Sequence, residues 1–394
     1  MIMRSLPMLS LAVLLGVVPL TERVEASESR ELRFPPLKDG RLVLSVDTHT
    51  HSVFSDGHVW PTVRVWEANK DRLDAMAITE HLEYQPHRED IPHPDRNRAF
   101  ELAMKENKQG RERTDLLLIP GAEITRKYAP GHVNALFIED TNPLLTVKNR
   151  REETFATARK ALKAAKAQQG FMIWNHPAWP RDFPDGVIQI SNKQQSLFDD
   201  GLIQGIEVAN GEYFNDSSLQ VALDHDLTII GASDIHGLID YDYDINARGH
   251  RTVTLAFTND RSVEGIAAAF FQKHTVAVYD RQFIARENEL KTLFDSLVQF
   301  ERLPARRDDS QQTAIRISNS GPIDIELEVL GDVSLNKSAG YVTVPSHGST
   351  IIVMLDHAPS DEIDLKLEWL NSWQAPKTHA SIEVTLQAQV PLIK

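Results

Sequence analysis

The segment Leu42-Val43-Leu44-Ser45-Val46-Asp47-Thr48-His49-Thr50-His51-Ser52 joins an apolar run to two histidines that stand two residues apart. The apolar run predicts a buried β-strand. Because side chains of a strand alternate between two faces, His49 and His51 leave it on the same face. Neutral imidazoles held side by side can each offer a ring nitrogen to one cation. Taken alone, the pair fits part of a metal site or two half-exposed histidines before a loop.

The chain has 394 residues, which exceeds one ordinary core and predicts two domains, or one large barrel with an appendage. Its composition, 41% hydrophobic and 25% charged, is typical of a soluble globular protein. The formal net charge of −14 argues against nucleic acid or an anionic membrane as the main partner, because both favour basic surfaces. A small phosphorylated substrate remains compatible, since bound divalent cations reverse the local field.

Residues 1–26 have the layout of a secretory signal peptide. Arg4 gives a positive start, Leu6 to Leu20 is apolar, and Val24-Glu25-Ala26 fits cleavage after Ala26. An uncleaved anchor is the alternative, although the stretch is short for a membrane span. The absence of cysteine fits an exported protein that is stable without disulfides. We expect an exported protein, periplasmic or secreted, with no membrane contact after cleavage.

Short apolar runs then alternate with amphipathic helical patterns up to residue 300. This alternation is typical of a parallel sheet covered by helices, and so many units favour a closed (β/α) barrel over an open sheet. The expected strands are Leu42–Val46, Ala75–Thr79, Leu116–Ile119, Val133–Ile138, Phe171–Asn175, Gly205–Ala209, Thr228–Ala232, Thr252–Phe257 and Val276–Tyr279. The expected helices are Thr62–Lys70, Asn97–Lys108, Glu152–Gln168, Ser217–His225, Ser262–Gln272 and Ala285–Phe300.

The pattern changes beyond a barrel domain over residues 27–300 and a polar linker over residues 301–311. Residues 312–394 show alternating strands with Gly, Pro, Asn and Asp at the joins, which predicts a small all-β, sandwich-like domain. This domain contains no cluster of metal-ligating residues. We expect a structural or interfacial role, with a homo-oligomer formed through this domain, or carbohydrate or surface binding, as further options.

Polar residues follow the ends of most expected strands in the barrel domain. The carboxyl ends of parallel strands form one face of a barrel, so these side chains are expected to converge. One such residue is more often a solvated loop side chain, but a set at successive strand ends predicts a metal centre. The set is His49, His51, Asp56, His81, Glu123, His132, His176, Asp234 and His236.

The ordered motifs HxH, EH, GAE, GHVN, NHP and SDxH resemble the polymerase and histidinol phosphatase (PHP) family of metal-dependent phosphoesterases over about residues 47–279. The resemblance implies an α/β fold, a distorted (β/α)7 barrel of PHP type, and three divalent metal ions. The first metal would be held by His49, His51, Glu123 and Asp234. The second would be held by Glu123, His132 and His176, and the third by Asp56, His81 and His236.

A narrower resemblance concerns residues 83–87 and 90–98. Together with the signal peptide and the β-rich C-terminal domain, these segments are similar to exported PHP phosphodiesterases that hydrolyse organophosphate diesters. Family members often have Asp at the position of Glu80, a change that we expect to affect only a supporting residue.

The expected reaction is metal-dependent hydrolysis of a small phosphodiester. A hydroxide held between two metal ions would attack phosphorus, with Glu123, Asp234 and His236 as the catalytic residues because they position it as ligands. Imidazole and carboxylate ligands without thiolate suit Mn, Zn or Fe. Side chains near the ligand-bearing strands are candidates for substrate contact, with solvated or merely structural positions as the alternative: Arg126, Lys127, Asn175, Arg181, Asn210 and Arg248.

Three other functions are compatible with parts of this pattern. A phosphomonoesterase would use the same metals, an amidohydrolase-type enzyme a similar barrel, and a non-catalytic extracytoplasmic metal- or surface-binding protein the same ligands. The sequence contains no GxxxxGK[ST] and no GxSxG motif, which argues against a P-loop nucleotide site and a serine hydrolase.

Overall fold

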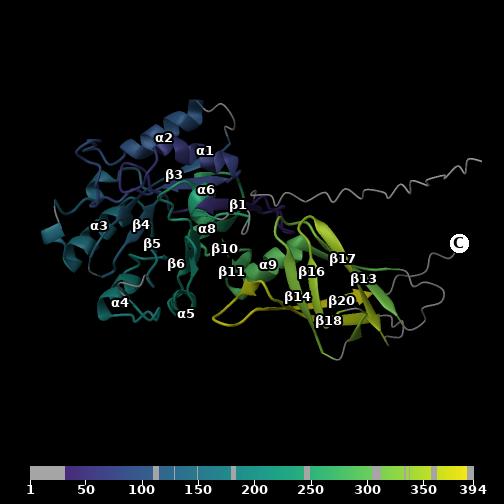
Figure 1. Ribbon diagram of the computed structural model, residues 1–394. Coiled ribbons are helices and arrows are strands. Elements are labelled where there is room, and N and C mark those ends of the chain that lie inside the picture. The colour runs from purple at the N-terminus through teal and green to yellow at the C-terminus, as the bar shows by residue number, and fades with distance from the viewer. Residues whose placement is uncertain are drawn as a thin grey trace, which may run out of the picture.

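The computed structural model describes residues 32–109, 115–127, 129–148, 150–178, 183–243, 249–303, 312–331, 334–336, 338–355 and 362–387. The predicted signal peptide and most of the predicted linker lie outside these residues. The chain forms a larger α/β lobe and a smaller all-β lobe (Figure 1). Within the described ranges, no helix is long and apolar enough to cross a membrane.

The larger lobe is built on one twelve-stranded sheet. Its strands are β1 (Leu42–Asp47), β2 (Ala75–Ile78), β3 (Leu117–Ile124), β4 (Val133–Leu136), β5 (Phe171–Trp174), β6 (Gly205–Asn210), β7 (Tyr213–Phe214), β8 (Thr228–Ala232), β9 (Val253–Thr258), β10 (Thr275–Tyr279), β11 (Gln282–Ile284) and β19 (Ser372–Trp373). A strand lies at each of the nine expected positions. β3 runs further than expected, so Glu123 lies within the strand rather than after it.

Helices pack around this sheet, and most of them lie where amphipathic patterns predict them. They are α1 (Pro61–Lys70), α2 (Arg98–Gln109), α3 (Phe155–Ala167), α4 (Asn192–Asp199), α5 (Asp216–Asp224), α6 (Ile239–Asp242), α8 (Val263–Phe271) and α9 (Glu287–Leu297), with short 3-10 helices over Asn142–Leu144 and Arg150–Glu152. Side-chain caps fix several starts. Thr154 accepts a hydrogen bond from the Thr157 amide at α3, and Ser191 accepts one from the Gln194 amide at α4.

The sheet is mixed, so the expectation of a parallel sheet was wrong. The runs β1–β2–β3 and β5–β6–β8 are parallel, but β4 is antiparallel to both neighbours and β9 is antiparallel to β1 and β10. The connection from β3 to β4 covers only residues 125–132. That length is too short for a crossover helix, and the chain therefore reverses as a hairpin. The α/β lobe itself is confirmed, while the seven-unit barrel stays a prediction.

The sheet curls until β8 meets β9 and β10, and threonine hydroxyls join them. Thr254 in β9 donates to the Gly231 carbonyl at 2.8 Å and accepts from the Gly231 amide at 2.9 Å. Thr275 in β10 donates to the Ile229 carbonyl at 2.8 Å. A Cβ atom at Gly231 would lie 2.8 Å from the Val253 carbonyl oxygen, so only glycine permits this approach. The contact brings the end of β8 beside β1, where the Asp234 amide donates to the His49 carbonyl at 2.9 Å.

The smaller lobe consists of two four-stranded antiparallel sheets, which confirms the all-β expectation. One sheet contains β12 (Val298–Arg302), β13 (Thr313–Asn319), β17 (Gly348–Leu355) and β15 (Ser334–Leu335). The other contains β16 (Tyr341–Val344), β14 (Ile325–Leu330), β18 (Glu362–Trp369) and β20 (Ala380–Gln387). The residues over Ala285–Phe300 do not form one helix as expected. The helix ends at Leu297, and Val298–Arg302 pairs with β13, because buried Val298 and half-buried Phe300 alternate with exposed polar neighbours.

β19 joins the two lobes. It leaves the smaller lobe and pairs in parallel with β11, with Ile284 opposite Trp373. Just before it, the buried Trp369 ring packs against Phe283, with 4.9 Å between centroids. The side-chain Nδ2 of Asn371 donates to the carbonyls of Arg281 and Asp324, both at 2.9 Å. The smaller lobe is therefore anchored directly to the sheet of the larger lobe.

The closing contact between β8 and β9 predicts a loss of stability when the Thr254 hydroxyl is removed. Thr254→Val keeps the shape but leaves the buried Gly231 amide and carbonyl without this partner, which costs about 2 kcal/mol of unfolding free energy. Urea unfolding followed by circular dichroism measures the change. Thr343→Val, at an exposed strand position, is the matched control and is expected to change stability by less than about 0.5 kcal/mol. Equal stability of the two variants would contradict the proposed closure.

Candidate metal centre

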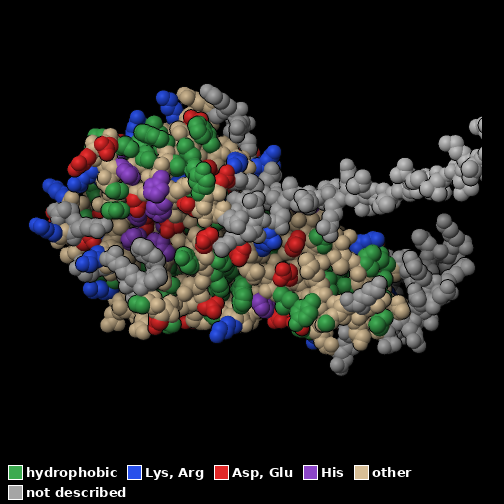
Figure 2. All heavy atoms as spheres, in the orientation of Figure 1, with side chains coloured by type: hydrophobic (Ala, Val, Ile, Leu, Met, Phe, Trp, Pro, Cys, Tyr) green, Lys and Arg blue, Asp and Glu red, His purple; other side chains and the backbone are tan. Residues whose placement is uncertain are grey.

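The nine residues that the sequence predicts as ligands converge at one end of the larger lobe's sheet. They come from the ends of β1, β2, β5 and β8, from β3 itself, and from the residue before β4. Figure 2 shows histidine side chains gathered at one place on the surface of this lobe. Three groups of side chains lie close enough together to hold a metal ion.

The first group is formed by the two histidines that follow β1. Their Nε2 atoms lie 3.0 Å apart. Asp234 Oδ1 is 3.2 Å from each of these nitrogens, and Glu123 Oε2 is 3.5 Å from His49 and 3.4 Å from His51. His49, His51 and Glu123 therefore lie close enough together to hold one ion, and Asp234 lies beside the two imidazoles.

Glu123 connects this first group to a second one. Its Oε1 lies 2.8 Å from His132 Nδ1 and 3.7 Å from His176 Nε2, whereas its Oε2 lies 2.6 Å from His81 Nδ1. The two carboxylate oxygens therefore face different sets of nitrogens, which suits a bridging ligand. The arrangement differs in one detail from the expected second site, because His81 lies closer to Glu123 than His176 does.

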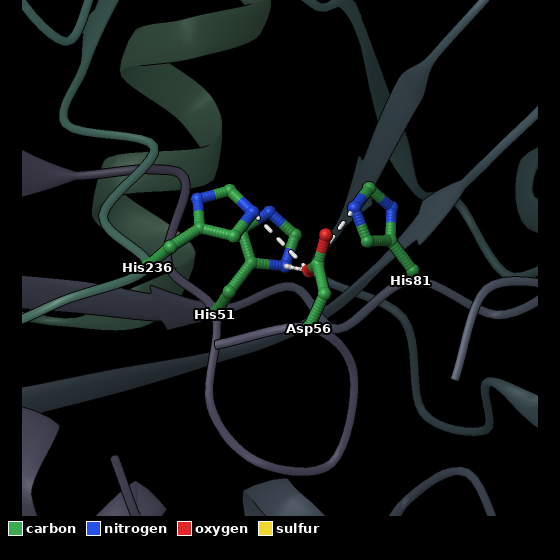
Figure 3. A group of neighbouring side chains, drawn as sticks. All are labelled: His51, Asp56, His81 and His236. Atoms are coloured by element: carbon green, nitrogen blue, oxygen red, sulfur yellow. Dashed lines mark ion pairs between the residues drawn. The ribbon is translucent and has the colours of Figure 1, made fainter. Parts of the chain in front are cut away.

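The third group surrounds Asp56, as Figure 3 shows. Asp56 Oδ1 lies 3.2 Å from His236 Nε2, 3.4 Å from His81 Nε2 and 3.9 Å from His51 Nδ1. Asp56, His81 and His236 are the residues expected at the third site, and the structure adds the ring of His51 beside them.

A tight loop and a buried arginine position these ligands. A Cβ atom at Gly57 would lie 2.7 Å from the His51 carbonyl carbon, so glycine lets the loop fold back and carry Asp56 to the cluster. Arg64 is fully buried and donates through Nε to the His51 carbonyl at 2.8 Å. Its Nη2 donates to the His236 carbonyl at 2.9 Å. Arg64 thus holds the loops after β1 and β8 together.

Hydrogen bonds on the outer sides of the rings leave ligand atoms facing inward. His49 Nδ1 donates to Glu207 Oε1 at 2.8 Å, and His51 Nδ1 lies 3.1 Å from Ser55 Oγ, which itself donates to Glu80. With their Nδ1 atoms turned outward, His49 and His51 point their Nε2 atoms toward each other inside the cluster, and a neutral ring binds a metal through this atom.

Three carboxylate oxygens in the same place are buried without a hydrogen bond of regular geometry. They are Asp56 Oδ1, Glu123 Oε2 and Asp234 Oδ1. Buried polar atoms normally have partners, and oxygens that face other acceptors need cations. The donor set of imidazoles and carboxylates fits divalent ions such as Mn²⁺, Zn²⁺ or Fe²⁺.

The charges within the cluster shift several pKa values. Burial opposes charge on Glu123 and Asp234, but the surrounding imidazoles outweigh it and hold the pKa of each carboxyl well below its usual range. Burial likewise opposes protonation of His81, yet Glu123 and Asp56 raise its pKa to about 10. Burial and the neighbouring imidazoles lower the pKa of His51 to about 3. The cluster therefore holds ionised carboxylates that attract positive charge.

Glu207 is a functional residue that the sequence analysis missed. It lies within β6 and is buried, and its Oε1 accepts from His49 Nδ1. Its Oε2 accepts from the His176 amide and from Asn210 Nδ2, both at 2.8 Å. Glu207 thus orients two ligand-bearing segments at once. A single charged residue inside the apolar strand Gly205–Asn210 is the signal that could have found it.

The two asparagines that the sequence predicts as substrate contacts lie in different places. Asn175 Nδ2 donates to Glu123 Oε1 at 3.1 Å, and Asn175 Oδ1 accepts from the Asn134 amide at 3.0 Å. Asn175 is buried and orients Glu123, whereas Asn210 lines the cavity over the cluster.

Two of the predicted basic contacts, Arg126 and Lys127, are not among the residues that line the cavity over the cluster. Arg126 is buried, forms an ion pair with Glu83 and donates to the Thr125 carbonyl at 3.0 Å, so it does not line the cavity. Lys127 is exposed and is not among the residues that line the cavity. Arg181 and Arg248 lie outside the described residues.

A cavity of about 650 Å³ opens over the cluster. One side is formed by ligand residues and the other by β6, β7 and the start of α5. No Lys or Arg occurs among the described residues that line it. These residues are Asp56, His81, Tyr84, Thr125, His132, His176, Ala178, Glu207, Val208, Asn210, Tyr213, Phe214, Asn215, Ser218, Asp234 and His236.

A curled α/β sheet that gathers six histidines and three carboxylates at one end is the architecture of a metal-binding protein. The chain is 36% identical to a two-domain protein from Bacteroides vulgatus ATCC 8482 that contains a predicted PHP-like metal-dependent phosphoesterase. The two structures superimpose with a TM-score of 0.81 over 91% of this chain and 99% of that chain. The chain therefore belongs to the PHP-like metal-dependent phosphoesterases, which confirms the resemblance seen in the sequence.

Two other solved structures are less similar. A protein from Bifidobacterium adolescentis ATCC 15703, assigned as a metal-dependent phosphoesterase, is 20% identical with a TM-score of 0.36, over 49% of this chain and 88% of that chain. An amidohydrolase from Chromobacterium violaceum is 16% identical with a TM-score of 0.35, over 49% and 87%. Both scores are too low to carry an argument. No protein-family model and no curated protein matches the chain.

The place of Glu207 predicts that Glu207→Gln weakens metal binding. Both carboxylate oxygens accept hydrogen bonds, and an amide would turn its NH2 group toward one set of donors. We expect metal affinity to fall about 10- to 100-fold, measured by titration of the metal-free protein with Mn²⁺ or Zn²⁺. Glu264→Gln, at an exposed position of α8, is the control and is expected to bind as the wild type does. Unchanged metal affinity in Glu207→Gln would contradict the role of Glu207 in orienting the ligands.

Proposed function

We propose that this protein hydrolyses small phosphodiesters at a centre of three divalent metal ions. Membership of the PHP-like phosphoesterases supports the reaction class, and the three groups of ligands support the number of ions. The observation that carries the choice of a diester is the cavity, which is large and, among its described lining residues, contains no Lys or Arg.

The residues present fit the metal ions that the family implies. The first ion would be held by His49, His51, Glu123 and Asp234. The second would be held by Glu123, His132 and His176, with His81 close to the same carboxylate. The third would be held by Asp56, His81 and His236. When bound, such ions make water a nucleophile at neutral pH and neutralise charge on phosphoryl oxygens.

The chain's own residues keep this centre in a fixed geometry. Glu207 holds the ring of His49 through Nδ1, and Asn175 holds the Glu123 carboxylate through Oε1. Arg64 ties together the backbones that carry His51 and His236. Glu123, Asp234 and His236, proposed as the catalytic residues, therefore act as rigid ligands and do not need to reorganise during the reaction.

The charge and size of the cavity favour a diester over a monoester. A phosphomonoester is largely dianionic near neutral pH and gains from additional Arg or Lys contacts, whereas a diester has a single negative charge. The described lining offers aromatic and apolar side chains instead, including Tyr84, Val208 and Phe214. A volume of about 650 Å³ also leaves room for two ester groups beside the phosphate.

The proposal predicts metal-dependent activity with a preference for diesters. Purified protein is analysed for bound metal and assayed on bis(p-nitrophenyl) phosphate and p-nitrophenyl phosphate. We expect three ions per chain and a kcat/KM for the diester about 10-fold or more above that for the monoester, which meets no Lys or Arg among the described lining residues. Removal of the metal by a chelator is expected to lower activity more than about 100-fold, and adding Mn²⁺ or Zn²⁺ is expected to restore it.

Asp56→Asn tests the third group separately. It is expected to leave two ions per chain, because the first two groups do not include Asp56. Asp364→Asn, at an exposed position of β18, is the control and is expected to retain three ions per chain.

In the comparison of the two substrates, faster turnover of the monoester would make the protein a phosphomonoesterase. Bound metal without turnover of either substrate would favour a non-catalytic metal-binding protein.

A further inference from the structure

Beside the metal ligands, the lining of the cavity includes an apolar wall, and part of this wall comes from β7. Phe214 is half-buried and lines the cavity together with Val208, whereas Tyr84, which also lines it, lies 5.9 Å from the ligand His81 between ring centroids. β7 is short and pairs with the end of β6, with Phe214 opposite Ala209. Because β6 also carries Glu207, the wall and the cluster are positioned by the same strand.

A tryptophan from the smaller lobe supports this wall from behind. The Trp373 ring lies against Phe214 with 6.0 Å between centroids and an interplanar angle of 33°. Trp373 Nε1 donates to Gln282 Oε1 at 3.1 Å, and the Trp373 carbonyl accepts from the Ala285 amide at 3.1 Å. His379 lies 4.5 Å from Trp373 between ring centroids. Trp373 is therefore fixed by its backbone and its indole.

The turn that carries Phe214 is also tied to the larger lobe. The Tyr279 hydroxyl donates to the Glu212 carbonyl at 2.6 Å, and the Thr252 hydroxyl donates to the Gly211 carbonyl at 2.7 Å. Gly211 has a φ of 56°, which a glycine adopts without strain. With its backbone held from one lobe and its ring supported from the other, Phe214 is a rigid surface rather than a mobile side chain.

We propose that the smaller lobe contributes to the active site through β19, the strand that it adds to the larger lobe's sheet. Phe214 forms a platform for a planar aromatic ester group of the phosphodiester, and Trp373 is the positioning residue that holds this platform. The inference rests on the proposed function, because it names the substrate class of the same centre. A flat ring gains from stacking on an aromatic side chain. An aryl group and a nucleobase share this chemistry.

The test measures the affinity of the protein for diesters and, in parallel, their hydrolysis. Metal-loaded protein is titrated by calorimetry with three diesters: diphenyl phosphate, diethyl phosphate and the methyl ester of thymidine 5′-phosphate. We expect Phe214→Ala to lower the affinity for diphenyl phosphate about 10-fold and Trp373→Ala to lower it about 5-fold. The affinity of both variants for diethyl phosphate is expected to stay within about twofold of the wild-type value. Trp373→Phe is expected to restore most of the loss. Tyr341→Ala, an exposed aromatic position in the smaller lobe, is the control and leaves all three affinities unchanged.

Each outcome decides between the possibilities. Stronger binding of diphenyl phosphate or of the thymidine diester identifies an aryl group or a nucleobase as the occupant, and either supports the platform. Equal weakening of aromatic and ethyl diesters in Phe214→Ala, or no weakening at all, overturns it. If Trp373→Ala does not fold, Phe214→Leu, which removes only the flat ring, decides the platform, and Trp373→Phe decides the support.

The same measurements separate the inference from the proposed function. If the aromatic preference depends on Phe214 but no diester is hydrolysed, the platform stands and the phosphodiesterase fails. If diesters are hydrolysed without any aromatic preference, the phosphodiesterase stands and the platform fails.

Discussion

The inward-facing oxygens of Asp56, Glu123 and Asp234 are the constraint on which the rest of the structure depends. They are gathered among imidazole nitrogens, below the surface, without hydrogen bonds of regular geometry. Such a gathering is unfavourable unless cations bind there, and so the scaffold must hold it in place. Several features around the sheet hold these oxygens in place. Gly231 lets β8 approach β9, and Arg64 draws the loops after β1 and β8 together.

A second buried arginine shows how far this support extends. Arg251 is fully buried between Asp47, at 3.1 Å, and Asp71, at 2.5 Å. Asp47 in turn accepts from the Ser233 hydroxyl at 2.7 Å, one residue before Asp234. Buried ion pairs contribute little net stability, because desolvation offsets their attraction. Here they fix the geometry instead, because Arg251 connects the ends of β1 and β8 to Asp71 at the end of α1.

The sequence was sufficient to predict candidate ligands where they stand at short, regular spacings. His49 and His51 stand two residues apart just after β1, and Asp234 and His236 repeat that spacing just after β8. The ends of the predicted strands therefore identified all four as candidates, although none of them lies within a strand. Contacts that depend on the tertiary fold could not be predicted in this way. Arg126 stands three residues after Glu123, but its side chain turns to Glu83. Glu207 lies in a strand whose pairing alone brings it to His49.

Dependence on tertiary contacts also explains why the strand Val298–Arg302 was not predicted from the sequence. Val298–Arg302 follows a helix without Gly or Pro, so only its pairing with β13 makes it a strand. Two more residues, Trp373 and Phe214, are far apart in the sequence and belong to short strands that carry no signal of their own. They meet because β19 adds to the edge of the larger lobe's sheet.

Contacts within the protein fix the backbone at two ligand positions. His176 and Asp234 have φ values of 26° and 51°, a conformation that is uncommon for non-glycine residues. Protein groups alone provide these contacts: the Asp234 amide binds the His49 carbonyl, and the His176 amide binds Glu207. Hydrogen bonds within the protein therefore balance the backbone strain at two ligands, which suits a site that has to keep its geometry during a reaction. The strain at these residues is balanced by the same strands that shape the cavity, so the scaffold, the ligands and the apolar wall form one unit.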